Sequence, residues 1–202
     1  MLDRLAVGLL RPSLTRAARG LAGLGVHADH VTLLGFGIGM AAAGAIVAHQ
    51  FLFGLVLLLL SRLCDGLDGA LARLTAATDR GAYLDITLDF LFYAAIPLAF
   101  AWVDPAANAL AAAVLLTAFI GTATTFLAFS VMAAQRGLKS DVYPTKGIYY
   151  LGGLTEATET LACFAAMCLW PSYFPQLASA FAALCALTIV MRLWTGWQVL
   201  SR

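Results

Sequence analysis

The chain reads DGLDGALAR at residues 65–73 and GAYLDITLD at residues 81–89, so two pairs of aspartates lie close together in the sequence. Asp65 and Asp68 are three positions apart. Asp85 and Asp89 are four positions apart. On helices, each pair therefore lies on one face. Four carboxylates in or near a membrane repel one another and lose hydration, so they require cations or bound protons. Their hard oxygen atoms suit Mg²⁺, Mn²⁺ or Ca²⁺ rather than zinc.

The composition around these stretches is that of a membrane protein. The 202 residues are 62% hydrophobic and 11% charged, whereas soluble domains carry about 25% charged residues. A membrane span needs about 20 apolar residues. We therefore expect an all-α integral membrane protein, with residues 1–202 forming one domain and residues 31–200 forming a six-helix bundle. The expected spans are 31–48, 50–72, 83–103, 107–134, 148–170 and 176–200.

The basic residues predict the orientation of the bundle. The connections near residues 49–50, 104–105 and 171–175 contain no Lys or Arg. Basic residues are found instead in the N-terminal segment, in loops 73–82 and 135–147, and at Arg202. By the positive-inside rule, both termini and all four aspartates face the cytoplasm of an inner or plasma membrane. We expect membrane lipids as partners and no nucleic acid.

The first 24 residues place leucines among four arginines, Arg4, Arg11, Arg16 and Arg19. This pattern predicts an amphipathic helix over residues 1–24 that lies in the membrane interface, with Pro12 breaking or kinking it. A mobile basic tail is the alternative. The segment lacks the long apolar core of a cleavable signal peptide. The four cysteines all lie in expected helices, so we predict no disulfide framework.

The aspartate stretches also resemble a family signature. The CDP-alcohol phosphotransferase motif is D-x-x-D-G-x-x-A-R, a spacer of seven or eight residues, and G-x-x-x-D-x-x-x-D. This chain fills all of its defining positions, with Asp65, Asp68, Gly69, Ala72, Arg73, Gly81, Asp85 and Asp89. The resemblance implies a homodimeric enzyme that uses Mg²⁺ or Mn²⁺, with two ions expected. It would transfer a phosphatidyl group from CDP-diacylglycerol to the hydroxyl of a polar alcohol and release CMP.

The resemblance also implies roles for the residues of the motif. Asp65, Asp68 and Asp85 would bind metal, while Asp89 would help to bind metal and take the proton from the acceptor hydroxyl. The nucleotide and diphosphate of the CDP-lipid would lie against Gly69, Ala72, Arg73 and Gly81. A side chain at the first glycine would block the approach of a phosphate or base, and a guanidinium can bind phosphate in a bidentate manner.

Upstream of the motif, the family often has P-N-x-x-T, and this chain has Ala28 and Asp29 followed by Thr32. Thr32 matches the pattern, whereas the alanine and the aspartate depart from it. Asp29 and Thr32 are therefore candidates to contact the nucleotide. Simple N-capping of the first transmembrane helix by Asp29 is the alternative.

The acceptor alcohol stays open at this stage, with glycerol 3-phosphate favoured over serine, choline or inositol phosphate. Four basic residues, Arg136, Lys139, Lys146 and Arg192, favour a phosphorylated acceptor such as glycerol 3-phosphate or inositol phosphate. Two intramembrane acids on the expected fifth helix, Glu156 and Glu159, favour serine or choline. An acid at membrane depth is energetically costly, so its presence indicates a function. Each set also has a structural interpretation: snorkelling of Arg192 to the interface, an ordinary positive-inside loop, or pairing of the acids with Arg192.

Other functions are compatible with the same residues. CDP could carry the small alcohol and a diacylglycerol could accept it. A cation- or proton-coupled transporter could use the aspartates as its ion site, although neither an inverted repeat nor broken helices are visible. A non-catalytic scaffold is a third possibility. Arg62 lies three helical turns before Arg73, and we expect it to pair with the aspartates rather than with lipid phosphate.

Overall fold

The computed structural model describes residues 2–137 and 152–201, with side chains described from Pro12 onward. Within these ranges the chain is helical and contains no strands, as the sequence predicts. The elements are α1 (Leu2–Gly23), α2 (Ala28–Val47), α3 (Phe51–Leu74), α4 (Asp79–Val103), α5 (Pro105–Gln135), α6 (Ala157–Leu169), the 3-10 turn η1 (Pro171–Tyr173) and α7 (Phe174–Leu200).

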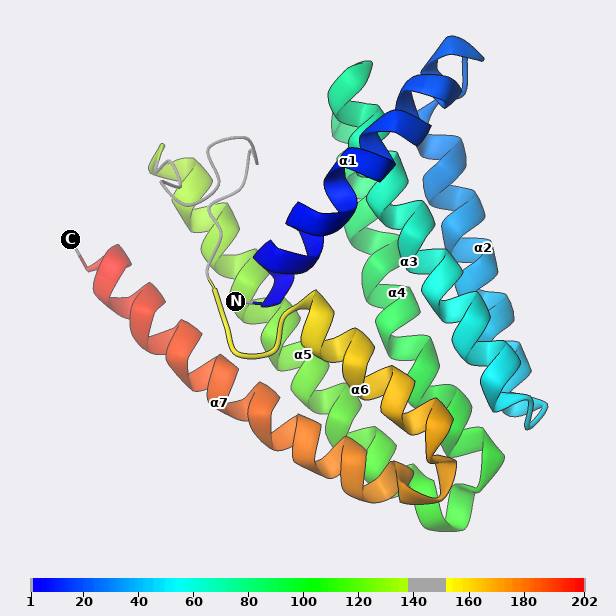
Figure 1. The fold of residues 1–202 in the computed structure, drawn as a ribbon. Helices are drawn as coiled ribbons and strands as arrows, with labels where there is room; N and C mark the ends of the chain where they lie inside the picture. Colours follow the sequence, from blue (N-terminus) through cyan, green and yellow to red (C-terminus); the bar gives the residue numbers. More distant parts are fainter. Residues whose placement is uncertain (1, 138–151, 202) are drawn as a thin grey trace.

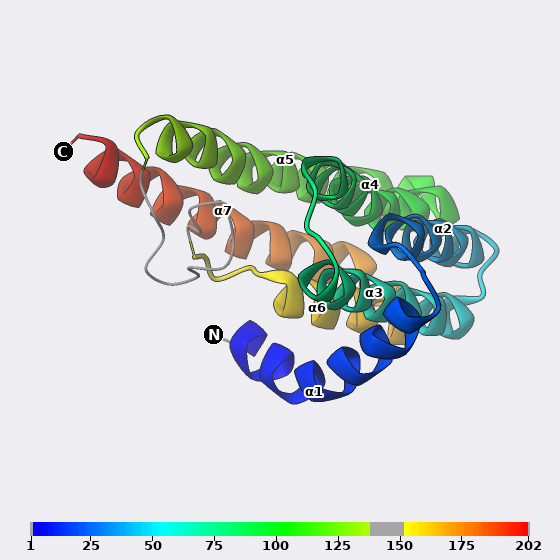
Figure 2. The same cartoon turned by 90° about the horizontal axis from the view of Figure 1, so that it is seen from above.

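Six of the helices form a closed ring. Each of α2, α4, α5, α7, α6 and α3 contacts the next in that order, and α3 returns to α2. Seen from above, α2, α4 and α5 form one row and α3, α6 and α7 form the other, with α1 outside the second row (Figure 2). Consecutive helices run in opposite directions, so the start of α4 and the ends of α3, α5 and α7 lie at the same end of the bundle (Figure 1).

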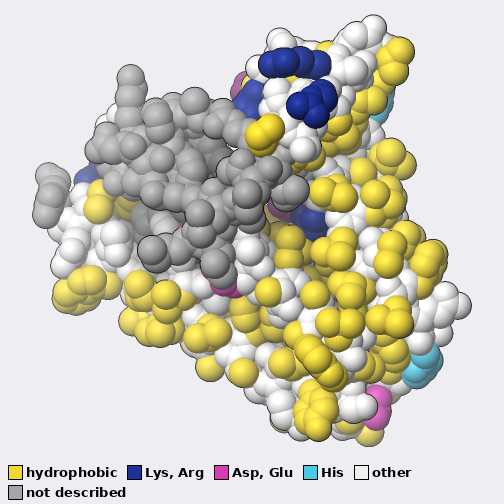
Figure 3. Space-filling view, viewed as in Figure 1, with side chains coloured by type: hydrophobic (Ala, Val, Ile, Leu, Met, Phe, Trp, Pro, Cys, Tyr) yellow, Lys and Arg dark blue, Asp and Glu magenta, His cyan; other side chains and the backbone are white. Residues whose placement is uncertain are grey.

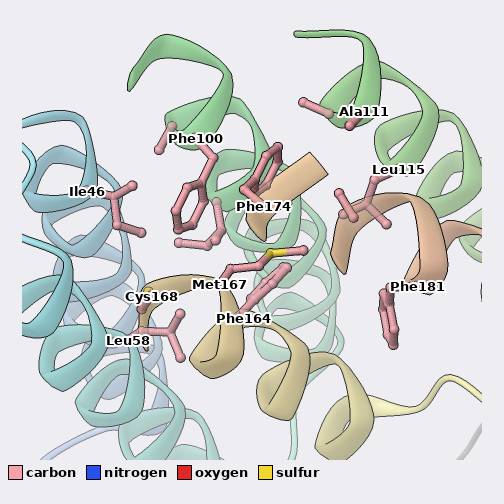
Figure 4. Packing of buried hydrophobic residues seen from close by; sticks show 14 of the residues in the cluster. Ile46, Leu58, Phe100, Ala111, Leu115, Phe164, Met167, Cys168, Phe174 and Phe181 are labelled. Atoms are coloured by element: carbon pink, nitrogen blue, oxygen red, sulfur yellow. The ribbon is translucent and has the colours of Figure 1, made fainter. Parts of the chain in front are cut away.

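The opposite end of the ring holds the main hydrophobic core. The second half of α4 and the first half of α7 meet there, and the rings of Phe100 and Phe174 stack with their centroids 4.7 Å apart (Figure 4). Leu58, Phe164 and Met167 are fully buried in the same cluster. From this end the helices diverge toward the end that carries the aspartates (Figure 1).

Close packing between α2 and its neighbours depends on two glycines. A Cβ atom on Gly35 would lie 2.8 Å from the Cβ of Cys64, and one on Gly39 would lie 2.5 Å from the ring of Phe92. Ser61 reinforces this crossing by donating a 2.7 Å hydrogen bond to the carbonyl of Gly35. These two glycines therefore allow close helix packing.

Four helical segments are long and apolar enough to cross a membrane: α2, α4, α5, and α7 together with η1. Helix α3 has 24 residues, a sufficient length, but from residue 62 onward it carries four charged residues, Arg62, Asp65, Asp68 and Arg73. The structure therefore supports four of the six predicted membrane spans. Hydrophobic side chains cover most of the lower part of the face in Figure 3, whereas basic side chains gather at its upper end.

The fifth expected helix is shorter than predicted. Residues 152–156 are not helical, and α6 has only 13 residues. At 1.5 Å per residue, this helix is about 20 Å long, less than the roughly 30 Å hydrocarbon core. The sequence-based span over residues 148–170 is therefore wrong as a continuous helix. The apolar run of the sequence begins before α6, but residues 152–156 are not helical.

The N-terminal segment is helical, and α1 continues through Pro12 without a break. Its second half packs small and apolar side chains, including Ala18 and Leu21, against a cluster with Ala70 and Leu71 of α3. This part of its apolar face thus contacts the protein. The location of the helix in the membrane interface stays a prediction.

Candidate active site

Three of the four predicted aspartates converge at the open end of the bundle. Asp65 and Asp68 come from the second half of α3, and Asp85 comes from the first half of α4. Each offers a carboxylate oxygen, and these oxygens all lie within 4.8 Å of one another. Asp68 is buried, Asp65 is half-buried and Asp85 is exposed. The i,i+3 spacing places both α3 aspartates on one face of the helix. The turn at residues 75–78 then returns the chain so that α3 and α4 both pack against α2.

This trio meets the requirements of a divalent cation. The Oδ2 atom of Asp68 is buried and has no hydrogen-bond partner within the described part of the chain, which is costly for a carboxylate. The adjoining cleft has a volume of about 10 Å³, roughly the space of one water molecule. Hard carboxylate oxygens around a small cleft suit Mg²⁺ or Mn²⁺. These residues therefore fit the predicted metal site.

Asp89 lies next to the trio but outside it. One of its oxygens pairs with the guanidinium of Arg62 at 2.5 Å, and the same guanidinium lies 3.5 Å from Asp65. Arg62 is packed over the ring of Phe92 at 4.0 Å, and its side chain is only 10% exposed. The predicted pairing of Arg62 with the aspartates is confirmed. Metal binding by Asp89 stays a prediction.

Asp89 also lines a second, much larger cavity. This cavity has a volume of about 520 Å³ and is bounded by α4, α5, the start of α6 and α7. Asp89 is thus shared between the small cleft of the aspartates and the large cavity. Tyr93 also lines the large cavity. It follows Asp89 by one helical turn, so the spacing could have identified it. Thr122 and Phe126 of α5 also line this cavity. No local sequence pattern predicted that these two residues belong to the site.

Two of the predicted nucleotide contacts lie near the start of α2. Thr32 lines the small cleft and donates a hydrogen bond to the carbonyl of Ala28. Asp29 pairs with Arg80 of α4 at 2.5 Å. His27, not Asp29, occupies the N-cap position of α2, so the alternative of N-capping is wrong. The helix begins two residues earlier than that alternative requires, and the ion pair joins α2 to α4.

The predicted cradle residues lie along the same end. A Cβ atom on Gly81 would lie 3.1 Å from Asp29 Oδ1 and 3.2 Å from Thr78 Oγ1, so these two side chains lie close against the glycine. A Cβ atom on Gly69 would meet only the guanidinium of Arg73, at 3.4 Å. Arg73 is exposed in the last turn of α3, and Ala72 is half-buried. The surface between Gly69 and Arg73 is therefore open to a ligand from outside.

The acceptor candidates separate into different places. Arg192 is buried on α7, lines the large cavity and donates from Nη1 to the carbonyl of Thr122 at 2.9 Å. The alternative in which Arg192 snorkels to the interface is therefore wrong. Arg136 is exposed and donates instead to the carbonyl of Leu200 at 2.6 Å. Lys139 and Lys146 lie outside the described residues.

The two glutamates begin α6 rather than lie within a membrane-spanning helix. They form a capping box, in which Glu159 Oε2 accepts from the backbone N–H of Glu156 at 3.2 Å. Glu156 lines the large cavity, whereas Glu159 is not among the described residues that line it. The prediction that both glutamates lie within one helix is therefore wrong for Glu156, which is the N-cap of α6, and their depth in the membrane stays a prediction. The three-residue spacing before an apolar run was the available signal for the cap.

Known proteins are similar to this chain. The family model described as CDP-alcohol phosphatidyltransferase matches residues 26–194. The inner membrane protein YnjF of Escherichia coli is 47% identical over 201 residues, which cover 100% of this chain and 98% of that protein. An archaetidylinositol phosphate synthase of Pyrococcus horikoshii is 33% identical over 97 residues, which cover 48% of this chain and 51% of that protein.

Solved structures are also similar. The phosphatidylinositol phosphate synthase PgsA1 of Mycobacterium tuberculosis with CDP-DAG bound aligns with a TM-score of 0.71 and 26% identity, covering 91% of this chain and 93% of that one. The same enzyme in complex with manganese and citrate aligns with a TM-score of 0.70 and 26% identity, covering 91% of this chain and 88% of that one.

Proposed function

The chain belongs to the CDP-alcohol phosphatidyltransferase family, and on this premise we propose that it transfers a phosphatidyl group from CDP-diacylglycerol to a polar alcohol and releases CMP. The observation that carries the proposal is the convergence of Asp65, Asp68 and Asp85 within 4.8 Å. The similar PgsA1 structures with CDP-DAG and with manganese support both the donor and the metal.

The donor would bind at the open end of α3 and α4. Asp65, Asp68 and Asp85 would hold Mg²⁺ or Mn²⁺, with Asp89 adjacent, and two ions are expected. When bound, the metal neutralises the charge of the diphosphate and stabilises the leaving phosphate. The exposed guanidinium of Arg73 would contact the diphosphate. The remaining cradle residues would position the nucleotide: Thr32, Asp29, Gly69, Ala72 and Gly81.

Asp89 would act as the base because it connects the two cavities. An acceptor alcohol in the large cavity would place its hydroxyl near this carboxylate, which Arg62 holds through one oxygen. The hydroxyl proton would pass to Asp89 as the acceptor oxygen forms a bond to the phosphatidyl phosphorus. The bond from that phosphorus to the CMP oxygen would break, and CMP would leave with the electron pair.

The membrane topology completes the proposal. We propose an inner-membrane protein of one domain in which α3 and the segment containing α6 complete six spans. Both termini and the aspartates would face the cytoplasm, where the CDP group is soluble, and α1 would lie in the interface. The family resemblance further implies that the protein is a homodimer. Cysteine labelling of the exposed α3–α4 turn from each side of the membrane would test the orientation, and labelling only from outside would contradict it.

The reaction is tested by CMP release from CDP-diacylglycerol by the purified full-length protein. With Mg²⁺ and an acceptor we expect release, and EDTA abolishes it until Mg²⁺ or Mn²⁺ is restored. Asp68→Asn should abolish release and lower Mn²⁺ affinity at least tenfold, because it removes a buried ligand. The matched variant Asp79→Asn, in the exposed first turn of α4, should do neither. Metal-independent release would refute the metal site.

A further variant separates catalysis from binding. Asp89→Asn should keep metal-dependent binding of CDP-diacylglycerol and lose CMP release. If neither binding nor release occurs with the wild-type protein, the enzyme proposal fails. Ion flux that depends on the aspartates but not on nucleotide would then favour a transporter, whereas loss of folding alone would favour a scaffold. Release only with CDP-linked small alcohols and diacylglycerol would indicate the reverse donor assignment.

A further inference from the structure

Arg62 is a largely buried cation that the family motif does not include. The motif begins at Asp65, three residues later on α3. The Arg62 side chain is 10% exposed, and its Nη1 atom lies 2.5 Å from an oxygen of Asp89 and 3.5 Å from an oxygen of Asp65. The guanidinium therefore reaches from α3 to α4 beside the aspartate trio. It contacts two of the four residues that a site for two metal ions would use.

Contacts other than those with the aspartates also hold this guanidinium in place. Its Cζ atom lies 4.0 Å from the ring centre of Phe92, and that ring is fully buried. Nη2 donates a hydrogen bond to Ser61 Oγ at 3.3 Å, and Ser61 itself donates to the carbonyl of Gly35. The cation–π contact and the charge-assisted hydrogen bond both stabilise a guanidinium at this position. Arg62 is thus packed into the crossing of α2, α3 and α4.

The four aspartates divide into two groups with different cationic partners. Asp65, Asp68 and Asp85 each offer an oxygen within 4.8 Å of the others, whereas Asp89 is described but does not belong to this group. Asp89 is paired with Arg62 instead. Asp65 belongs to the trio and also lies beside Arg62, so it connects the trio to the guanidinium.

A second metal ion would compete with Arg62 for the same carboxylate oxygens. Beside an ion held by the trio, a second ion would need Asp89 together with Asp65. It would lie about 2.0–2.1 Å from their oxygens, which Nη1 of Arg62 already contacts. Two cations a few ångströms apart also repel each other, most strongly where burial lowers the effective dielectric constant. The chain itself therefore supplies the positive charge between these two aspartates.

We propose that Arg62 takes the place of the second divalent ion, so that this chain binds a single Mg²⁺ or Mn²⁺ ion at Asp65, Asp68 and Asp85. This inference rests on the proposed function and replaces one of the two ions expected there with a residue of the chain. Arg62 is then a positioning residue, because it holds one oxygen of Asp89 while that carboxylate lines the large cavity. Asp89 binds no metal and acts only as the base.

Electron paramagnetic resonance of Mn²⁺ bound to the full-length protein tests this inference without any turnover. At saturating Mn²⁺, with and without CDP-diacylglycerol, we expect the spectrum of an isolated ion at the aspartates. Two ions about 3.5–4 Å apart, as in two-metal sites, would instead give a spectrum broadened by magnetic coupling. A coupled pair in the wild type overturns the inference and leaves the proposed function standing. If no Mn²⁺ binds, the inference and the proposed metal site both fail.

Substitutions at Arg62 separate the effect of its charge from that of its packing. Arg62→Met removes the charge, so a second Mn²⁺ ion should bind beside the first and the coupled spectrum should appear. Arg62→Lys keeps a positive charge and should give the wild-type spectrum. Arg80→Met removes an exposed guanidinium that pairs with Asp29, and it should also give the wild-type spectrum. If Arg62→Met is folded and shows only an isolated ion, the inference is overturned. The wild-type spectrum decides the inference even if this variant does not fold.

Discussion

Arg62 offers the sharpest test of the electrostatics at the aspartates. We expect Arg62→Met to destabilise the metal-free protein while leaving the apolar contacts of the side chain largely in place. The guanidinium is 10% exposed, and its partners Asp65 and Asp89 are 35% and 32% exposed. Breaking a fully buried ion pair costs 3–5 kcal/mol and an exposed one about 0.2–1 kcal/mol. Because the acids are about one-third exposed, we expect an intermediate loss of about 2 kcal/mol.

Thermal unfolding in detergent with and without Mn²⁺ measures this effect. For a chain of this length, about 2 kcal/mol corresponds to a decrease in Tm of roughly 4–8 °C. The variant loses one positive charge beside the carboxylates, so it should bind Mn²⁺ more tightly. Saturating Mn²⁺ should therefore raise Tm more in the variant than in the wild type, since a ligand of the folded state stabilises it according to its affinity.

Arg80→Met is the matched control. Its guanidinium also pairs with an aspartate, Asp29, but its side chain is 78% exposed. The loss should be less than about 1 kcal/mol, and the response to Mn²⁺ should not change. The reasoning is refuted if Arg62→Met is as stable as the control. It is also refuted if Mn²⁺ stabilises the wild type as much as Arg62→Met, because Arg62 would then not compensate the aspartates.

Three further predictions concern packing and the CDP-lipid cradle. Gly39→Ala should lower the free energy of unfolding by about 1–3 kcal/mol, because the space for the added methyl group is already filled. In the same Tm measurement, Gly37→Ala should be neutral or slightly stabilising, because its added Cβ would meet nothing within 4 Å. Arg73→Ala should weaken binding of CDP-diacylglycerol about tenfold in a binding titration, the value of one charge-assisted contact. The control Arg19→Ala should not weaken it. Equal losses of affinity for the two variants would show that Arg73 does not contact the diphosphate. Gly69→Leu should prevent that binding with no change in Tm, since the position is open on the protein side; normal binding would refute the cradle.

The helical class of the protein and its aspartate trio were both predictable. Hydropathy and i,i+3 or i,i+4 spacing are properties of neighbouring residues, so they located α2, α3, α4, α5 and α7 to within a few residues. They also placed Asp65 and Asp68 on one face of α3. Helix α6 was the exception, because an apolar run does not specify where a helix begins. The capping box of Glu156 and Glu159 fixes that point.

The roles within the site depended on tertiary structure. Asp89 follows Asp85 by one turn and was expected to join the same metal group. The packing of α3 and α4 on α2 brings Arg62 to one oxygen of Asp89, and the carboxylate lines both the small cleft and the large cavity. Whether Asp89 also binds metal stays a prediction. The non-helical segment before α6 likewise meets α7 at Gly153, and this contact brings Glu156 and Arg192 near the same glycine.

The sequence by itself therefore determined the family motif, the helical membrane class and the candidate metal ligands, because each depends on residues within a few turns of one another. Only the tertiary structure decided which charges are neighbours and which groups share a cavity. Residues such as Glu156 and Arg192 are far apart in the chain, and electrostatic interactions depend on distance in space rather than on separation in sequence.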